Sequence, residues 1–179
     1  MSLRSKKLHS KTVVLSGEIN ISSVMNCLED INEIIEFNDY YEEPEAPIRL
    51  IMNSSGGSVY DGFALIGLIE TSPVPVHTYA YGQIMSMAFP IFVCAQKRFS
   101  SPYTTFMYHQ IAWEAPYDKI EWHKQEAKEG DRLQKLFDGV ISKHSKLPKA
   151  SMDDVKRTKS EWYISPAEAK KFGVVDKIL

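Results

Sequence analysis

Apolar residues recur along this chain at two different intervals, and the two intervals alternate from one segment to the next. Three short runs rich in apolar and β-branched residues end at glycine or at small polar residues, as strands do: 11–17, 48–53 and 74–81. Between them, over 21–37 and 59–70, apolar residues fall three and four positions apart, as on one face of a helix. Strands that alternate with helices predict an α/β fold.

The second half of the chain continues this alternation. The run "MAFPIFVCA", 87–95, is typical of a buried helix, and "YTTFMYH", 103–109, of another strand. A long helix is predicted over 119–144, where apolar residues repeat at intervals of three and four. The final residues, 174–179, are expected to form a short strand.

Two further helix starts are indicated by capping patterns. Ser151 is followed three residues later by Asp154, which resembles a capping box. In "SPAEAKKFG", Ser165 is the expected cap, Glu168 its partner and Gly173 the stop signal.

Composition limits the domain organisation and the partners. A chain of 179 residues with 44% hydrophobic content can bury one proper core, and it contains no linker or repeat, so we predict a single domain over 1–179 with a flexible head at 1–11. A formal net charge of −2 and a pI near 6.2 give no indication of nucleic-acid or anionic-membrane binding.

The predicted location is cytoplasmic. The first dozen residues lack the apolar segment of a signal peptide. The longest apolar run, 78–96, is interrupted by Gly82, Gln83, Ser86 and Pro90, so it does not predict a membrane span. Two cysteines far apart in sequence are expected to be buried thiols in a reducing compartment. We expect no metal, because the histidines lack ligand spacing, and no cofactor.

Two segments could carry chemistry. In "NSSGGSV", 53–59, paired glycines between a strand and a helix let backbone amides approach a ligand, although an ordinary turn capped by Ser58 would look the same. Ser86 lies inside an apolar run at a predicted strand-to-helix junction, where it is either a helix cap or a nucleophile. Among five histidines, His109 has the best position for a base, at the end of an apolar strand, although a structural role is the commoner one for any single histidine.

Five separated blocks then resemble, in order and spacing, the ClpP family of self-compartmentalised serine proteases. The blocks are "NSSGGSVYDGFALIGLI", "YGQIMSMAFPIF", "KRF", "MYHQI" and "EWYISPAEAKKFGVVDKIL", and the similarity extends from about Thr12 to Leu179. The resemblance implies a ClpP/crotonase-like fold of repeated strand–helix units with a protruding handle helix, here in the region 111–145. The compact head and altered handle are more similar to members encoded by bacteriophages.

Carried over to this sequence, the resemblance implies a serine endopeptidase. Ser86 matches the nucleophile and His109 the general base, while the backbone amides of Gly57 and Met87 match the two donors of the oxyanion hole. The family further implies peptide or unfolded-protein substrates, a homo-oligomer built as a heptameric ring, and an AAA+ unfoldase partner that makes it the protease component of an ATP-dependent system.

The triad acid departs from the family pattern. Ungapped alignment puts Glu161 where the family has aspartate, and a glutamate can orient an imidazole although it is one methylene longer. The fallback candidates for this role are Asp153, Asp154 and Asp176.

Other departures concern the helix after the serine and the assembly. Pro90 removes a backbone donor close to Ser86 and is expected to reshape that helix, whereas Ser55 in place of proline is a milder change. Few residues precede the first strand, "IAWEAPYD" replaces a glycine-rich strand, and Trp162 replaces an arginine used between rings, so unfoldase docking and the double ring stay open.

Three alternatives accompany the peptidase hypothesis. A non-catalytic ring subunit or scaffold would keep the fold, but this chain retains both the serine and the histidine. A crotonase-type acyl-CoA enzyme shares the fold and the two-amide hole but has no need for the Ser86–His109 pair. A Ser–Lys peptidase is disfavoured, because Lys97 lies at the far end of the helix after Ser86.

Overall fold

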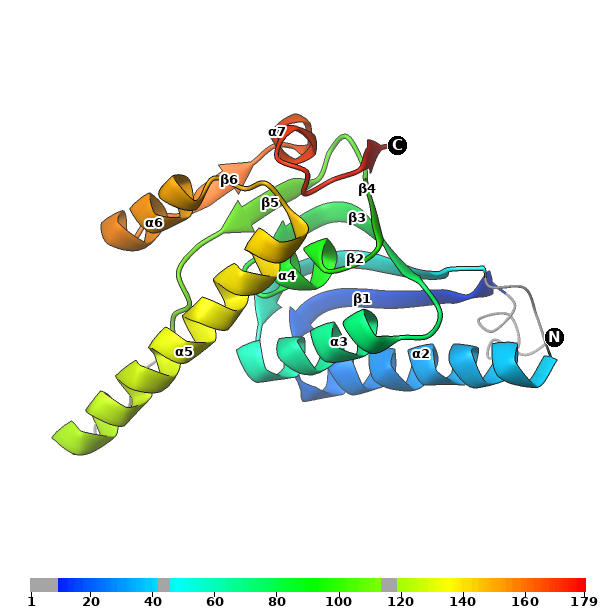
Figure 1. Cartoon of the computed structure of the whole chain (residues 1–179), viewed down its shortest axis with the longest axis horizontal. Coiled ribbons are helices and arrows are strands. Elements are labelled where there is room, and N and C mark those ends of the chain that lie inside the picture. Colours follow the sequence, from blue (N-terminus) through cyan, green and yellow to red (C-terminus); the bar gives the residue numbers. More distant parts are fainter. Residues whose placement is uncertain (1–9, 42–45, 114–118) are drawn as a thin grey trace.

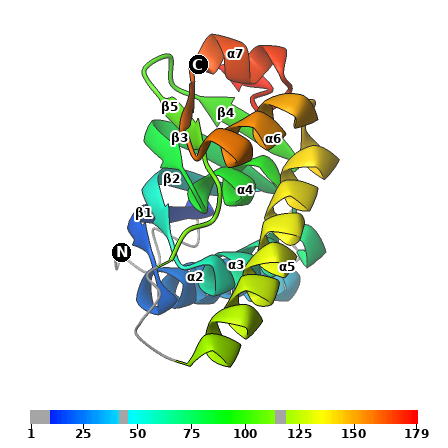
Figure 2. The same ribbon diagram turned by 90° about the vertical axis from the view of Figure 1, so that its left-hand side faces the viewer.

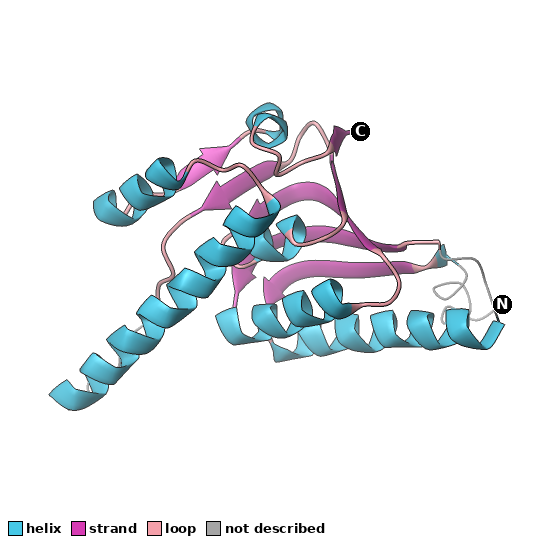
Figure 3. Ribbon diagram, viewed as in Figure 1, coloured by secondary structure: helices cyan, strands magenta, loops and turns pink. Residues whose placement is uncertain are grey.

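The computed structural model describes residues 10–41, 46–113 and 119–179. Its strands are β1 (Thr12–Ile19), β2 (Ile48–Gly57), β3 (Val76–Met85), β4 (Lys97–Ser100), β5 (Thr105–Tyr108), β6 (Trp162–Ile164) and β7 (Lys177–Ile178). Its helices are α2 (Ile21–Tyr41), α3 (Val59–Thr71), α4 (Ala88–Val93), α5 (Ile120–His144), α6 (Lys149–Thr158) and α7 (Pro166–Lys171). The α/β fold class predicted from the hydrophobic pattern is confirmed (Figure 3).

One sheet organises the described chain. Five of its strands follow the order β1-β2-β3-β4-β7, all parallel, and a branch adds β5 beside β3 and then β6 beside β5. The strand β3 therefore has two partners on one side: its residues 77–80 pair with β4, and its residues 83–85 pair with β5. Only the β5–β6 pair is antiparallel among the described strands.

Helices cover the sheet and form the core with it. Helix α2 packs against β1 and α3, and α4 packs against β2 and β3 with α5 beside it (Figures 1 and 2). The first half of α5 extends away from the sheet in Figure 1. Side chains of β1 to β3, α4 and β5 fill the interior, among them Leu15, Leu50, Met52, Ile84, Phe89, Phe92 and Phe106.

The strand that leads to Ser86 is longer than the sequence predicts. The expected end at Gly82 is wrong, because β3 continues to Met85. Gly82 has a φ of +73°, and the Asn53 side chain accepts a hydrogen bond from the next amide, that of Gln83, at 3.2 Å. The irregularity is therefore absorbed within the strand, which resumes pairing with β5.

Other boundaries differ for local reasons. The capping box at Ser151 is wrong: α6 starts at Lys149 after Pro148, whose carbonyl accepts from the Ser151 amide. The box at Ser165 and Glu168 is confirmed. Strands β4 and β6 were not predicted, since their three or four residues carry no clear alternation.

Parts of two predicted regions lie outside the described residues. Of the head at 1–11, residues 1–9 are not described, while Lys11 is buried and its carbonyl accepts from the Arg49 amide. Of the handle region at 111–145, residues 114–118 are not described, and the rest comprises the segment 111–113 and helix α5.

Candidate active site

Ser86 occupies a sharp turn between β3 and α4. Its φ is +51°, a left-handed conformation that costs an L-residue about 1–2 kcal/mol. Two backbone hydrogen bonds hold this conformation: the Ser86 amide donates to the Met107 carbonyl at 3.1 Å, and the Ser86 carbonyl accepts from the Phe89 amide at 2.9 Å. Strain of this kind persists only where the surroundings over-determine it, so these two bonds fix the backbone of the serine.

The helix-cap interpretation of Ser86 is wrong. Helix α4 begins at Ala88 and its N-cap residue is Met87, which makes no side-chain cap bond. Pro90 is the third residue of α4, where a backbone N–H has no partner within the helix in any case. The expected loss of a hydrogen bond at Pro90 therefore does not arise, and the helix forms directly behind the serine.

The end of β2 lies directly against this turn. A Cβ at Gly56, whose φ is +100°, would lie 2.6 Å from the Ser86 Cβ and 3.0 Å from the Met87 nitrogen. A Cβ at Gly57 would lie 2.2 Å from the Ile19 carbonyl oxygen. Only glycine fits at both positions, and the bare Cα of Gly56 leaves space in front of the Met87 amide.

His109 meets Ser86 across the β3–β5 pair. The register pairs Met85 with Met107, so both strands end side by side just before the two residues. His109 Nε2 lies 2.7 Å from Ser86 Oγ. When Nε2 carries no proton, it accepts this hydrogen bond from the serine hydroxyl. Burial lowers the pKa of His109 below its usual value, and the charge of Glu161 opposes that shift. The imidazole is thus held neutral at neutral pH, as a general base must be.

Glu161 is near His109 but is not hydrogen-bonded to it. The antiparallel register pairs Tyr108 with Trp162, and one further step brings Glu161 opposite His109. The Glu161 carboxylate is exposed and accepts a short hydrogen bond from the Tyr163 hydroxyl. Among the bonds of the described residues none joins Glu161 to His109, so only the electrostatic influence on the ring is present.

The fallback acids are engaged elsewhere. Asp176 forms an ion pair with Arg98 at 2.7 Å, and Asp153 lies 3.0 Å from Lys156. Asp154 forms its ion pair with Arg157 on the same helix. The charge that acts on the His109 ring is that of Glu161, which leaves Glu161 the best-placed carboxylate among the four.

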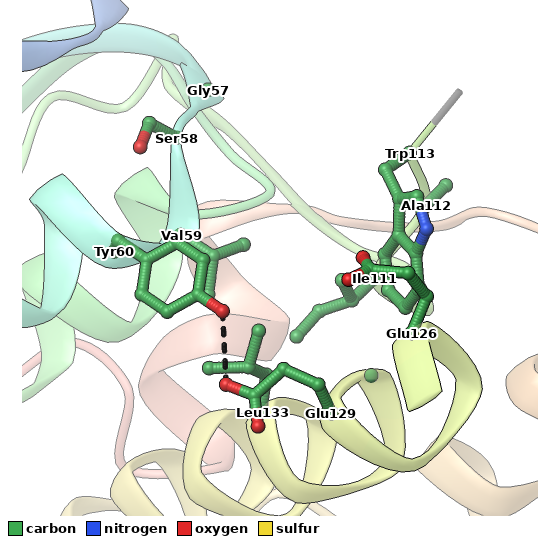
Figure 4. A pocket seen from close by; sticks show the side chains of 11 residues that line it. Gly57, Ser58, Val59, Tyr60, Ile111, Ala112, Trp113, Glu126, Glu129 and Leu133 are labelled. Atoms are coloured by element: carbon green, nitrogen blue, oxygen red, sulfur yellow. Dashed lines mark hydrogen bonds between the residues drawn. The ribbon is translucent and has the colours of Figure 1, made fainter. Parts of the chain in front are cut away.

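Gly57, the residue after the Gly56 that abuts the Ser86 turn, lines a pocket of about 350 Å³. Residues 57–60, residues 111–113 and four residues of α5 between 126 and 133 line it (Figure 4). Neither this pocket nor the role of Tyr163 was predicted from the sequence. Tyr163 had a usable signal, because residues two apart on a strand share a face and Glu161 and Tyr163 are two apart.

A model of the Clp protease family matches residues 2–179, nearly the whole sequence. The chain belongs to the Clp protease family. Among solved structures it is similar to that of a ClpP1 mutant from Listeria monocytogenes, with 27% sequence identity and a TM-score of 0.82. That match covers 99% of this chain and 96% of the ClpP1 chain. The ClpP fold is therefore shown, and membership supports a protease function in general, with peptide substrates and an oligomeric assembly.

Metal-ligand clusters and membrane-spanning helices are both absent from the described residues. Within 10–41, 46–113 and 119–179, no three His, Cys, Asp or Glu side chains are grouped so that they could hold a metal ion. In the same ranges no helix has the length and apolarity needed to cross a membrane.

Proposed function

We propose that this Clp family member is a serine endopeptidase with Ser86 as nucleophile and His109 as general base. The observation that carries the proposal is the 2.7 Å contact between Ser86 Oγ and His109 Nε2 at a strained turn. A neutral imidazole in hydrogen-bond contact with a serine that is presented at the start of a helix is the arrangement that nucleophilic catalysis requires.

The proposed reaction has two halves. Ser86 Oγ attacks the peptide carbonyl while His109 Nε2 takes the hydroxyl proton, and the imidazolium then protonates the leaving amine. The acyl group is left as an ester on Ser86. A water molecule, deprotonated by His109, attacks the ester, and the proton returns to Ser86 as the acid product leaves.

The backbone amides of Gly57 and Met87 are proposed to hold the oxyanion. Support comes from the missing side chain of Gly56, which lets the end of β2 approach the Ser86 turn and leaves space in front of the Met87 amide. The missing side chain of Gly57 lets the same end of β2 lie against Ile19 of β1. Losing one donor of such a pair typically costs on the order of a hundredfold or more in rate.

Glu161 is proposed as the group that favours the imidazolium. The pKa of His109 is raised by its charge relative to burial alone, which is the direction that stabilises the protonated ring. The hydrogen bond from Tyr163 competes for this carboxylate, so the contribution is electrostatic in the conformation described.

We further propose that the protease works in the cytoplasm as a homo-oligomeric heptameric ring that receives peptides or unfolded chains from an AAA+ unfoldase. This proposal rests on family membership and on the whole-chain likeness to ClpP1. Light scattering on the purified protein tests the ring: a mass of seven subunits or of fourteen is expected, and a monomer would contradict it.

Covalent labelling tests the catalytic pair. A fluorophosphonate probe at neutral pH should label the wild type but neither Ser86→Ala nor His109→Ala, while Ser151→Ala and His123→Ala, which change the same residue types on helices α6 and α5, should label normally. Absence of labelling in the folded wild type would favour a non-catalytic ring subunit. That alternative has one observation behind it, the bond that draws Glu161 to Tyr163.

A further inference from the structure

The pocket beside Gly57 has a distinct chemical character. Its apolar walls come from Val59 and Ile111 and from Leu133 on α5, and Trp113 closes one side (Figure 4). Two carboxylates, Glu126 and Glu129, line it as well, and both come from the first half of α5.

The Trp113 ring packs against α5 at Gly130, where the helix carries no side chain. A Cβ at Gly130 would lie 1.9 Å from the Trp113 ring, so the ring occupies the place that a side chain would otherwise take. Trp113 is nevertheless 45% exposed, and it lines the pocket. Indole faces attract cations more strongly than other aromatic rings do.

The two carboxylates are not equivalent. Glu129 accepts hydrogen bonds from Tyr60 at 2.9 Å and from Arg132 at 2.6 and 2.7 Å, and these partners, Arg132 above all, lower the pKa of Glu129 to about 2. Its charge is therefore compensated. Glu126 is half-buried and has no hydrogen bond or ion pair to any other residue within the described ranges. Figure 4 shows its carboxylate directed from α5 toward the space between Trp113 and Tyr60.

We propose that this pocket binds a lysine or arginine side chain on the residue whose carbonyl Ser86 attacks. The inference rests on the proposed peptidase function and adds a substrate class to it. Gly57 connects the pocket to the proposed catalytic site, because its amide is a proposed oxyanion donor and the same residue lines the pocket. A substrate carbonyl bound at the Gly57 amide therefore places the side chain of its own residue next to the pocket.

A long basic side chain matches each part of this lining. Its methylenes pack along Val59 and Leu133, as basic side chains do when only their heads are polar. Its cationic head meets Glu126 and the face of Trp113. A leucine would fill the apolar part but leave the Glu126 carboxylate desolvated without a partner, and a glutamate would be repelled.

The test compares peptides that differ only at this residue, with Lys, Leu or Glu before the cleaved bond. The measured quantity is the ratio of the kcat/KM values for two peptides. Each value is calculated from the concentration of fluorophosphonate-reactive sites, so that misfolded protein does not contribute to it. Wild type should prefer Lys over Leu and Leu over Glu. Glu126→Gln should lower the Lys-to-Leu ratio about tenfold, the size of one charge-assisted contact. Glu126→Lys should favour the Glu peptide.

Glu121→Gln is the matched control. It removes the same charge from the same helix, at an exposed position paired with Lys124, and should leave all three ratios unchanged. A wild-type preference for Leu, or a Lys-to-Leu ratio that Glu126→Gln does not move, would overturn the inference while labelling of Ser86 still supports the peptidase. If the wild type neither labels nor cleaves any peptide, the proposed function fails and the inference fails with it.

Discussion

The two sides of the imidazole at His109 are built differently. On the Ser86 side, both residues follow neighbouring strands of the buried sheet, and the serine backbone is held by hydrogen bonds to Met107 and Phe89. On the Glu161 side, the carboxylate is exposed, precedes the three-residue strand β6 and is bonded to Tyr163 instead of the ring. The core thus sets the nucleophile and base, whereas the orienting acid depends on a short strand at the sheet's margin.

The strongest way to break the Ser86 side is to fill the space beside it. Gly56→Ala forces a Cβ to within 2.6 Å of the Ser86 Cβ and strains a φ of +100°. Because a displacement of about 1 Å in an active site can cost a hundredfold, we expect kcat/KM to fall about a hundredfold or more. Steady-state kinetics on protein verified as folded by circular dichroism measures it.

Gly67→Ala is the control for this substitution. Its added Cβ meets nothing within 4 Å on helix α3, so activity should persist and stability should rise by about 0.5–1 kcal/mol. If Gly56→Ala kept full activity, the close approach of β2 to the Ser86 turn would not be required for catalysis.

The Glu161 side is tested through the pH dependence of kcat/KM. Burial lowers the pKa of His109 below about 6.5, so the neutral base, and with it activity, is retained above that lowered pKa and lost as pH falls through it. Glu161→Gln removes the charge that raises this pKa, so the acid limb should move to still lower pH. The plateau rate should fall at least about tenfold, because the imidazolium formed during reaction loses its counter-charge.

Tyr163→Phe sharpens the same comparison from the opposite direction. It removes the hydrogen bond that holds the Glu161 carboxylate, so the plateau rate should stay level or rise. If Glu161→Gln lowered the rate less than tenfold and left the acid limb in place, the orienting role would belong to another group.

The smallest effect is expected far from the imidazole, at a carboxylate that the sequence left as a candidate for the acid. Asp176→Asn breaks the ion pair with Arg98. Because the Asp176 side chain is 39% exposed, the free energy of unfolding should drop by only about 1 kcal/mol. Urea denaturation measures the loss. The rate per fluorophosphonate-reactive site should not change, and a rate that fell as in Glu161→Gln would contradict the assignment.

Local signals in the sequence predicted local structure well. Ser165 and Glu168 form the capping box that their spacing predicts, since a cap involves only residues of one helix turn. Ser151 has similar spacing but follows Pro148, which is itself the cap and starts the helix three residues earlier. Gly82 was interpreted as a strand end because the sequence does not reveal the hydrogen bond that Asn53, on the neighbouring strand β2, accepts from the Gln83 amide.

The candidate site was predictable to different depths. Ser86 and His109 were singled out by their places at strand ends and by resemblance, and they meet because parallel strands β3 and β5 end side by side. The choice of Glu161 between His109 and Tyr163 could not be predicted, because it depends on the rotamer of an exposed side chain with two partners in reach. The pocket lined by Glu126 and Trp113 could not be predicted, because it lies between segments that are distant in sequence and the hydrophobic periodicity does not indicate how they pack together.

The division of β3 between two partners has a practical consequence. Its first half belongs to the continuous sheet with β4, and only its last three paired residues, next to β5, lead to the serine. Melting temperature reports on the cooperative unfolding of the whole sheet and not on the geometry of this short segment. A screen that ranks variants of this protein by heat resistance would therefore pass many that are inert, and inhibitor reactivity has to be assayed separately.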